Sequence, residues 1–447
     1  MPTDPTYPPT PQAWYAVTIL TIAYICSFID RQILSLLVVP IRRDLAISDT
    51  QMSLLMGISF ALFYTLFGLP IGRLADSSSR RNLITLGVLT WSLFTAGCGL
   101  AATYPLLFLM RVGVGVGEAA LSPPAYSLLS DYFPPRQRPL ALSVYGLGIF
   151  IGSGLAMILG GIIVPYTASG GTITLPLIGL AVYPWQITFF VIGLPGLLIA
   201  ALVRTVPEPV RQERQTALPV SLAAIFAYIK SHRATFGCHH LATALITFAA
   251  YGINAWTPSF LMRTYGWSVG QAGLYFGVAV TIFSSLGILA GGWYCQSLAR
   301  RGYRDAHFRV GLVTSVLALP FVILFPLMPT PELAMLFLIP CLFLQATMFG
   351  VAPAALQQVA PNEMRAQISA VYLFVINLIG LGAGPTVIAL VTDRVFHDDN
   401  MLRYSILFVC AAAWLLSALL WWVGLAPYRR TLHQAEMTKS NARPCPC

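Results

Sequence analysis

Residues 72–81 read Gly-Arg-Leu-Ala-Asp-Ser-Ser-Ser-Arg-Arg, and residues 292–301 read Gly-Trp-Tyr-Cys-Gln-Ser-Leu-Ala-Arg-Arg. Both begin with Gly, carry an acid or an amide four positions later, and end in an Arg pair. A second pair of segments matches in the same order: Pro134 to Arg138 with Val144-Tyr145 after it, and Pro361 to Arg365 with Val371-Tyr372 after it. The two offsets, 220 and 227 residues, are nearly equal. The chain is therefore predicted to be a tandem repeat of two similar halves.

The composition is that of a protein whose surface faces lipid. Of 447 residues, 57% are hydrophobic and only 9% are charged, whereas soluble domains carry about 25% charged residues. The net charge of +10 does not indicate a nucleic-acid partner, because lysine occurs only at Lys230 and Lys439 and the arginines form short clusters between apolar runs. We expect the lipid bilayer as the surroundings and no nucleic acid as a partner.

Apolar runs long enough to span a bilayer, about 20 residues, recur along the chain. They lie near residues 14–40, 51–72, 82–101, 104–130, 139–164, 185–204, 236–262, 270–298, 308–328, 332–358, 366–391 and 402–426. The predicted fold is an all-α membrane protein with twelve transmembrane helices in two six-helix bundles. The predicted parts are an N-terminal tail (1–12), the first bundle (13–204), a linker (205–235), the second bundle (236–427) and a C-terminal tail (428–447).

The linker and the basic residues indicate the orientation. In the linker, Leu222, Ile225, Phe226 and Ile229 recur at helical spacing, which predicts an amphipathic helix at the cytoplasmic interface of the membrane. With a cytoplasmic N-terminus, nineteen of the 26 Lys and Arg residues fall in inside loops and tails and five in outside loops. The excess of basic residues inside predicts two cytoplasmic termini in a multi-pass protein of the cell inner (plasma) membrane. The first residues lack the pattern of a cleavable signal, so the first run is expected to remain as a helix.

Four ionisable side chains fall inside predicted spans: Asp30, Arg31, Arg111 and Glu118. Such groups cost free energy in a membrane and usually mark a substrate or proton pathway. At about 1.5 Å per residue, Asp30 and Arg111 lie at similar depth, so we expect them to pair, with Glu118 deeper on the same face of its helix. Arg31 points about 100° away from Asp30 and is assigned either to packing or to the substrate cavity.

Two interpretations of these charges remain open. One is a static ion pair that joins the spans 14–40 and 104–130. The other is a switch, in which Arg111 holds an anionic substrate head or exchanges between Asp30 and Glu118 as one carboxylate is protonated. Gly113, Gly115 and Gly117 make the span 104–130 slim enough for close packing.

The loop at residues 72–81 resembles the signature Gly-x-x-x-Asp-Arg-x-Gly-Arg-Arg of the major facilitator superfamily. Gly72 matches its glycine, Asp76 its acid, and Arg80 and Arg81 its basic pair, while serines replace the usual Arg and Gly between them. The resemblance implies a secondary transporter whose substrate site lies between two bundles. It also implies that this loop is a cytoplasmic latch, which Asp131 is expected to join.

Within that superfamily, the first 160 residues resemble the Spinster lipid transporters. The segments that carry this resemblance are Ile29-Asp30-Arg31, Trp91-Ser92, Arg111 to Ala119 and Gly152 to Leu155. Organic-anion symporters also carry Arg and Glu in the span that holds Arg111 and Glu118. The resemblance therefore implies either a carrier of lysolipid-like amphiphiles or a proton symporter of a small organic acid.

The second half carries uncharged polar groups at membrane depth: Asn254, Gln345, Asn377 and Tyr372, with Tyr251 nearby. Each is either a hydrogen-bonded packing residue or part of the substrate cavity. The first half therefore offers a charged wall and the second half a mostly apolar one. With the resemblance to the Spinster transporters, this arrangement suggests an amphiphile whose anionic head meets Arg111 and whose tail meets the second half.

No motif for catalysis or for a bound cofactor is recognised, so we expect neither an enzyme nor a cofactor or metal site. His239-His240 is interpreted as an interfacial pair without partners for a metal. Cys445 and Cys447 are interpreted as part of a disordered tail, with binding of a soft metal as the alternative. The sequence thus predicts a monomeric, proton-linked transporter of an anionic amphiphile, such as a lysophospholipid or a sphingosine-phosphate-like lipid. The alternative is a proton symporter of a small organic anion.

Overall fold

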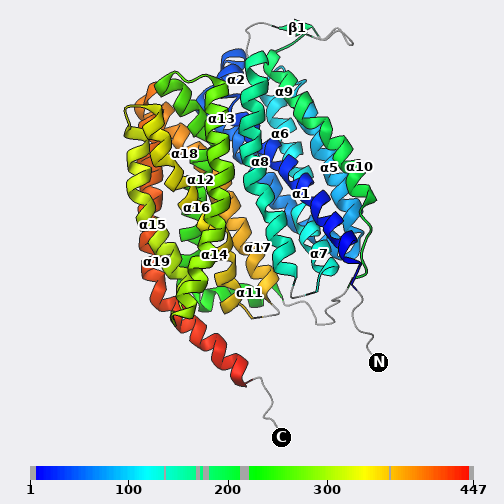
Figure 1. Cartoon of the computed structure of the whole chain (residues 1–447), viewed down its shortest axis with the longest axis vertical. Coiled ribbons are helices and arrows are strands. Elements are labelled where there is room, and N and C mark those ends of the chain that lie inside the picture. The colour runs from blue at the N-terminus through cyan, green and yellow to red at the C-terminus, as the bar shows by residue number, and fades with distance from the viewer. Residues whose placement is uncertain are drawn as a thin grey trace. The chain divides into compact units, whose positions relative to one another are not determined.

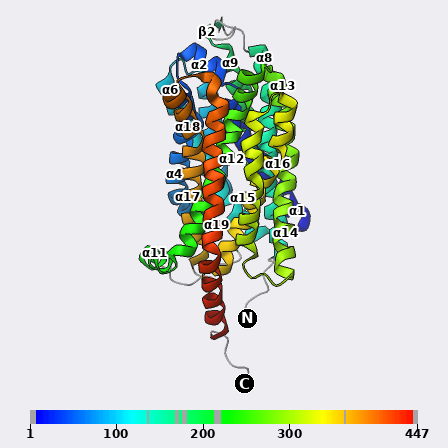
Figure 2. The same cartoon turned by 90° about the vertical axis from the view of Figure 1, so that its left-hand side faces the viewer.

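The computed structural model describes residues 7–134, 137–167, 172–174, 181–211, 221–361 and 364–441. The predicted role of the tail cysteines Cys445 and Cys447 lies outside these residues. Almost all described residues are helical (Figures 1 and 2). The mainly helical class expected from the sequence is therefore confirmed for the described part of the chain.

The first part of the chain forms a series of helices joined by short turns. In order, they are α1 (Thr10–Gln32), the short 3₁₀ helix η1 (Ile33–Ser35), α2 (Val38–Leu45), α3 (Asp49–Met56), α4 (Ile58–Ser77), α5 (Arg80–Cys98), α6 (Tyr104–Glu118), α7 (Ser122–Tyr132), α8 (Arg138–Thr167), α9 (Pro184–Gly193) and α10 (Pro195–Thr205). Between α8 and α9, β1 (Ile173–Thr174) pairs with β2 (Ala181–Val182) in antiparallel register, a small hairpin that the sequence analysis did not predict.

The second part begins with α11 (Leu222–Ser231), the expected linker helix, on which Ile225 is buried and Phe226 exposed. The following helices are α12 (Arg233–Tyr265), α13 (Val269–Ala279), η2 (Val280–Ser284), α14 (Ser285–Arg300), α15 (Ala306–Leu324), η3 (Phe325–Leu327), α16 (Pro331–Val359), α17 (Arg365–Ile376), η5 (Asn377–Ala383), α18 (Gly384–Leu390), η6 (Val391–Phe396), η7 (Asp399–Met401) and α19 (Leu402–Asn441). Of these, η2, η5 and η6 are π-helical, a form that often occurs at functional positions.

Among the described residues, eleven helical segments are long and apolar enough to cross a membrane. They coincide with the predicted spans except for the third. That position is occupied by α5, a helix of 19 residues that opens on Arg80 and Arg81 and is not among the eleven. The chain is a multi-pass membrane protein.

One predicted span is not a single helix. The run 104–130 is divided, because α6 ends at Glu118 and α7 begins at Ser122. Pro123 and Pro124 occupy the first turn of α7, where a missing N–H is tolerated, but neither could continue a preceding helix without loss of a hydrogen bond. The break places Glu118 at a helix C-terminus.

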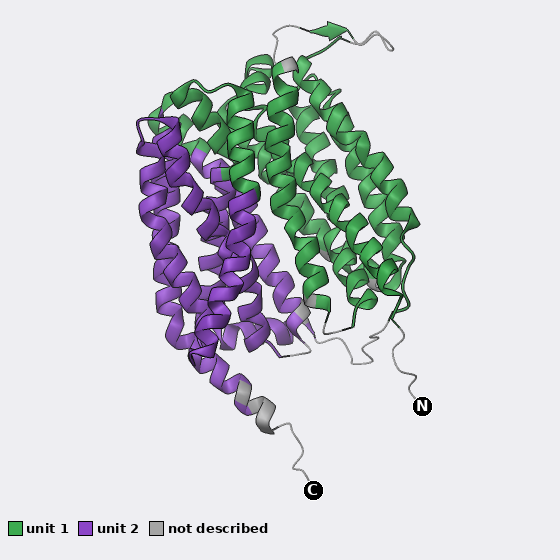
Figure 3. Cartoon of the chain, viewed as in Figure 1, with its two compact units in different colours: residues 1–216, 254–281, 389–400 green, residues 217–253, 282–388, 401–447 purple. Residues whose placement is uncertain are grey.

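The described helices group into two compact units (Figure 3). Unit 1 comprises residues 1–216, 254–281 and 389–400, and unit 2 comprises residues 217–253, 282–388 and 401–447. In unit 1, α8 packs along α1 and α13; in unit 2, α15 and α19 run side by side (Figures 1 and 2). Unit 1 thus includes segments of the second half of the chain, unlike the predicted bundles 13–204 and 236–427, which remain a prediction.

Glycines allow two close helix contacts inside unit 1. A Cβ atom at Gly117 of α6 would lie 2.6 Å from the backbone nitrogen of Trp91 on α5, and one at Gly277 of α13 would lie 2.6 Å from the carbonyl oxygen of Gly154 on α8. Both separations are shorter than van der Waals contact, so any side chain there would force the helices apart. The first contact fixes α6, which carries Arg111 and Glu118, against α5.

Candidate functional site

Arg31 and Glu118 form a buried ion pair between the end of α1 and the end of α6. Arg31 Nη2 and Nε donate to Glu118 Oε2 over 2.6 and 2.9 Å. Ser27, one helical turn before Arg31, donates its hydroxyl to the same oxygen over 2.5 Å. The side chains of Arg31 and Glu118 are only 7% and 0% exposed. Two helices far apart in sequence are therefore joined by one carboxylate oxygen.

The surroundings of this pair stabilise the cation and leave part of the anion free. The Arg31 guanidinium lies 4.5 Å from the ring centre of Phe28, 4.3 Å from Phe60 and 5.0 Å from Tyr64, distances at which the ring faces attract a cation. Glu118 lies at the C-terminus of α6, where the helix dipole disfavours a negative charge. Its Oε1 atom has no hydrogen-bond partner among the described residues. That oxygen is where a proton or a ligand donor can bind.

Arg111 of α6 and Asp30 of α1 are in contact on the same two helices that carry Glu118 and Arg31. Arg111 is fully buried, and its Nη1 donates to the main-chain carbonyl of Asp30 over 3.2 Å. Its Nε and Nη2 atoms have no acceptor among the described residues. Asp30 accepts a hydrogen bond from Thr95 at Oδ2 over 3.2 Å, while its Oδ1 has no partner there. A buried guanidinium therefore presents two free donors on one edge.

The expected partner assignment is wrong in two respects. Among the described residues, Arg111 contacts the main chain of Asp30 and forms no ion pair with its carboxylate. Arg31, which was separated from the charged face because it lies 100° from Asp30, is the residue that pairs with Glu118. Its long side chain can reach across the end of α1, so the direction of the Cα–Cβ bond alone did not decide the contact.

The polar residues expected in the second half occupy separate positions. Asn254 is half-buried on α12 in unit 1. In unit 2, Gln345 of α16 is buried and its Oε1 lacks a hydrogen-bond partner among the described residues. Asn377 opens the π-helical segment η5. Tyr372 is buried on α17 against His239 and His240. Their role in substrate binding stays a prediction.

The loop motif forms a charge cluster inside unit 1. Arg80 is fully buried and contacts Asp131 at the end of α7, and its Nε donates to Glu208 Oε1 over 2.8 Å. Arg81 contributes its main-chain N–H to Glu208 Oε2 over 2.9 Å. Asp131 thus lies in contact with the motif, and the role of this cluster as a cytoplasmic latch stays a prediction. Gly72 lies on α4, and the side chain of Asp76 lies outside what the structure describes.

Glu208 is a member of this cluster that the sequence analysis missed. It stands between Pro207 and Pro209 in the segment after α10, which was interpreted only as linker. Its carboxylate accepts from Arg80, from the main chain of Arg81 and from Ser79. The one local signal was an acid held between two prolines, which keep a segment extended.

Glu208 provides a prediction on pH dependence. Burial alone would raise the pKa of Glu208, but the hydrogen bonds from Arg81, Arg80 and Ser79 outweigh it and hold the pKa below its ordinary value. Since the pKa is lower in the folded state, the contribution to stability is complete above the ordinary pKa of about 4.3 and is lost as the pH falls through the lower folded value. Glu208→Gln should therefore lower the free energy of unfolding by about 1.5–3 kcal/mol at neutral pH, and the difference from wild type should vanish in acid.

The measurement is thermal unfolding in detergent over a series of pH values. Glu332→Gln is the matched control, because Glu332 is exposed in the first turn of α16 and no ion pair is recorded for it in the described part of the chain. A Glu208 variant whose destabilisation does not depend on pH would contradict the assignment.

A second charge cluster lies where α2 and α3 of unit 1 meet the end of α12 and the segments η6 and η7. We call it the ionic cluster: Arg42, Asp49, Arg263, Asp393 and Asp399. Asp49 is fully buried and accepts two hydrogen bonds from Arg263, over 2.6 and 2.8 Å, and an ion pair from Arg42 over 2.9 Å. Arg42 also binds Asp399 over 2.6 Å.

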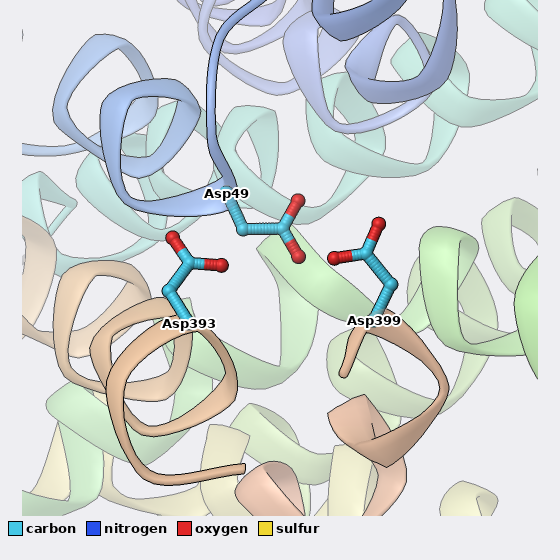
Figure 4. Close-up of side chains that lie close together, drawn as sticks. All are labelled: Asp49, Asp393 and Asp399. Carbon is cyan, nitrogen blue, oxygen red and sulfur yellow. The ribbon is translucent and has the colours of Figure 1, made fainter. Parts of the chain in front are cut away.

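The three acids of the ionic cluster face one another (Figure 4) and are close enough to hold a metal ion. The carboxylate oxygens that would bind a metal, however, already accept hydrogen bonds or form ion pairs. Asp49 and Asp399 bind the two arginines, and Asp393 Oδ2 accepts from the main-chain N–H and the hydroxyl of Thr50 over 2.7 and 2.6 Å. A cation there would have to displace two guanidinium groups, so the arrangement fits an ion-pair network better than a metal site.

Comparison with known proteins relates the chain to membrane transporters. Residues 20–385 match the model of the Major Facilitator Superfamily. An MFS-type efflux pump of Mycolicibacterium smegmatis is 29% identical over 428 residues, which cover 94% of both chains. The hexuronate transporter of Bacillus subtilis is 26% identical over 67% of this chain and 68% of its own length. The sphingosine-1-phosphate transporter SPNS2 of Danio rerio is 25% identical over 85% of this chain and 76% of its own.

Among solved structures, the chain is similar to a bacterial homologue of the human lysosomal transporter Spinster, in an inward-facing and unoccupied conformation. The sequence identity is 25%, the TM-score is 0.76, and the match covers 96% of this chain and 99% of the other. The resemblance to Spinster proteins expected from the first 160 residues is thereby confirmed, and it extends over most of the chain.

Proposed function

Because the chain belongs to the major facilitator superfamily, we propose that it is a proton-linked secondary transporter that moves an anionic amphiphile by alternating access. The substrate class is a lysophospholipid or a sphingosine-phosphate-like lipid. In this proposal α5 completes a set of twelve transmembrane helices in two bundles. Both termini are cytoplasmic, the membrane is the cell inner membrane, and the working unit is a monomer. The surplus of Lys and Arg in the loops assigned to the inside supports the orientation.

The observation that carries the proposal is the unpaired edge of Arg111. A guanidinium buried in a membrane protein is costly unless it is paired. Its Nε and Nη2 point along one edge of the planar group, the geometry that binds two oxygens of a phosphate or carboxylate at once. Neither atom has an acceptor among the described residues. An anionic substrate head would supply both acceptors.

Proton coupling is assigned to Glu118. Its Oε2 holds Arg31 and Ser27, whereas Oε1 is free among the described residues. Protonation at Oε1 would remove the negative charge and weaken the bond to Arg31, which would release α1 from the end of α6. The uptake of a proton would thereby favour a different arrangement of these two helices.

The second candidate is a proton symporter of a small organic anion. A relative named as a hexuronate transporter matches two thirds of this chain, and a carboxylate would occupy Arg111 equally well. The two candidates differ in what binds beyond the charged head. A relative named as a sphingosine-1-phosphate transporter covers more of the chain, which favours the amphiphile.

The test is uptake by liposomes that contain the purified protein, under an imposed pH gradient. The panel comprises a lysophospholipid, sphingosine phosphate and a hexuronate. Accumulation of either lipid that collapses with the gradient supports the first candidate, and gradient-driven accumulation of hexuronate alone supports the second. Accumulation that ignores the pH gradient would refute proton coupling in both.

In the proposed cycle the ionic cluster holds one end of unit 1 closed and must open for substrate to exchange there. Asp49→Asn is expected to loosen it strongly, because the two arginines would lose a buried charged partner, a loss of about 3–5 kcal/mol. We predict at least about tenfold faster hydrogen exchange, the change that about 1.4 kcal/mol produces, in peptides that cover residues 42–52 and 389–400.

Hydrogen exchange read by mass spectrometry checks this prediction. The control is Asp44→Asn, because Asp44 lies on the same helix as Arg42 but pairs with its neighbour Arg43, whose side chain is 47% exposed. Equal exchange in Asp49→Asn and Asp44→Asn would remove the ionic cluster from the mechanism.

A further inference from the structure

His239 and His240 of α12 form a buried pair in unit 2. They are 1% and 6% exposed. Their Nδ1 atoms are 3.2 Å apart, and His239 Nε2 lies 2.9 Å from the main-chain carbonyl of Ala352 on α16. The site described above, which lies in unit 1, uses neither residue.

The hydrogen-bond chain fixes the protonation of both rings. A carbonyl oxygen only accepts, so His239 Nε2 carries its proton, and His239 Nδ1 is bare in the neutral ring. His240 Nδ1 must then carry the proton that bridges the two rings. His240 Nε2 is therefore bare, and it has no hydrogen-bond partner among the described residues. This assignment leaves one buried, basic nitrogen with a free lone pair.

The neighbours of the pair are aromatic or weakly polar. The Tyr372 ring centre lies 5.4 Å from that of His239 and 5.7 Å from that of His240. Phe236 lies 5.8 Å from His240, and Trp421 lies 5.7 Å from His239. These contacts are T-shaped or tilted, arrangements that stabilise aromatic packing.

The titratable groups that face the pair are Tyr372 from α17 and His307 from α15, which acts electrostatically on His239. On α19, Tyr428 stacks on Phe308, which in turn packs on His239. Within the described residues, no carboxylate makes an ion pair with either histidine. The pair is thus not held charged by a fixed anion.

We propose that His239 and His240 form a second proton-binding site, which takes one proton for the pair at His240 Nε2. The resulting imidazolium would donate from Nδ1 to His239 Nδ1, a charge-assisted bond that is stronger than the neutral one. His239 donates in turn to the carbonyl of Ala352 on α16. The positive charge on His240 would therefore polarise, and strengthen, both hydrogen bonds of this series. A second proton would put N–H groups on both facing Nδ1 atoms and break the bond between the rings.

This inference deepens the proposed function and rests on it: the proton that couples transport would have one acceptor in unit 1, Glu118, and another in unit 2. The charged His240 would also present an N–H to an anionic ligand, whereas the neutral ring presents only a lone pair. The pair would therefore bind an anion only after it has bound a proton.

The first test reads the ring nitrogens of ¹⁵N-histidine-labelled protein in detergent, without substrate. The pH series runs from about pH 8 to about pH 4 and so extends below the interval of about pH 5 to 8 in which histidine ordinarily titrates. The signals distinguish a bare nitrogen from an N–H. His240→Gln identifies the signals of His240 among the six histidines, and His433→Gln, at an exposed position of α19, serves as the control that leaves the pair intact. We expect His240 Nε2 to be bare at high pH and to gain a proton in acid, while His239 Nδ1 remains an acceptor.

The second test counts bound protons over the same range. The double variant His239→Gln/His240→Gln retains a donor and an acceptor at each position, so the chain to Ala352 can persist, and it should bind one proton fewer than wild type. A loss of two protons, or of none, would overturn the proposal, as would an Nε2 of His240 that is protonated at every pH. Neither test requires transport, so a failure of the proposed function would be recognised separately. Glu118→Gln should retain the histidine proton.

Discussion

Glu118→Gln is expected to lower the accumulation of substrate under a pH gradient by about 5–150-fold, the range that coupling free energies of about 1–3 kcal/mol produce. Glutamine keeps the shape of the side chain and can still accept from Arg31, but it cannot take up or release a proton. Exchange of substrate without a gradient should be affected much less. The measurement compares the two kinds of uptake in the same liposomes.

The double variant Arg31→Gln/Glu118→Gln separates this role from a purely structural one. Glu118→Gln alone leaves the buried guanidinium of Arg31 without a counter-charge, which costs about 3–5 kcal/mol of stability, partly offset by the rings of Phe28, Phe60 and Tyr64. Neutralising both partners should restore most of that stability, because two amides can bond to each other.

If the pair only joins α1 to α6, the double variant should regain proton-driven accumulation together with stability. If Glu118 carries the coupled proton, the double variant should be stable and still uncoupled. We expect the second result. Full gradient-driven accumulation by the double variant would disprove the assignment to Glu118.

The depths of the buried charges could be predicted from the sequence, but their partners could not. Counting residues from the membrane surface brought Asp30 level with Arg111, and the structure joins them through a main-chain carbonyl. The rotation of α1 about its axis depends on its packing against α8, and the position of α6, which ends at Glu118, depends on its packing against α4 and α5. An ideal, isolated helix contains none of that information.

Long-range charge clusters were missed for a related reason. Arg42, Arg263 and Asp399 stand at the ends of apolar runs, where charges ordinarily serve only as topology signals. Asp49 meets Arg263 across 214 residues of sequence, a contact that only the fold creates. The internal repeat was more informative, because it paired Tyr145 with Tyr372. Tyr145 is buried against the ring of Tyr24 in the first half, and Tyr372 is buried against the ring of His239 in the second half.

Arg111→Lys is expected to weaken the binding of an anionic substrate by about 10–100-fold, which corresponds to about 1.4–2.8 kcal/mol and to the loss of a charge-assisted bond. Lysine retains the positive charge beside Asp30, so the electrostatic environment of that carboxylate is preserved. It loses the two parallel donors of the guanidinium edge, Nε and Nη2, which are the atoms left unbonded among the described residues.

The substrate comparison makes this prediction specific. For wild type, the apparent affinity is measured for a lysophospholipid with an anionic head and for an analogue with the same chain and an uncharged head. Arg111→Lys should lose affinity for the ligand with the anionic head and little affinity for the uncharged analogue. The control is Arg31→Lys: because the donors of Arg31 already bind Glu118, this variant should not change the ratio of the two affinities. Both ligands have the same hydrocarbon chain. An equal loss of affinity for both would therefore mean that Arg111 supports the helix packing of α6 and does not recognise the charged head.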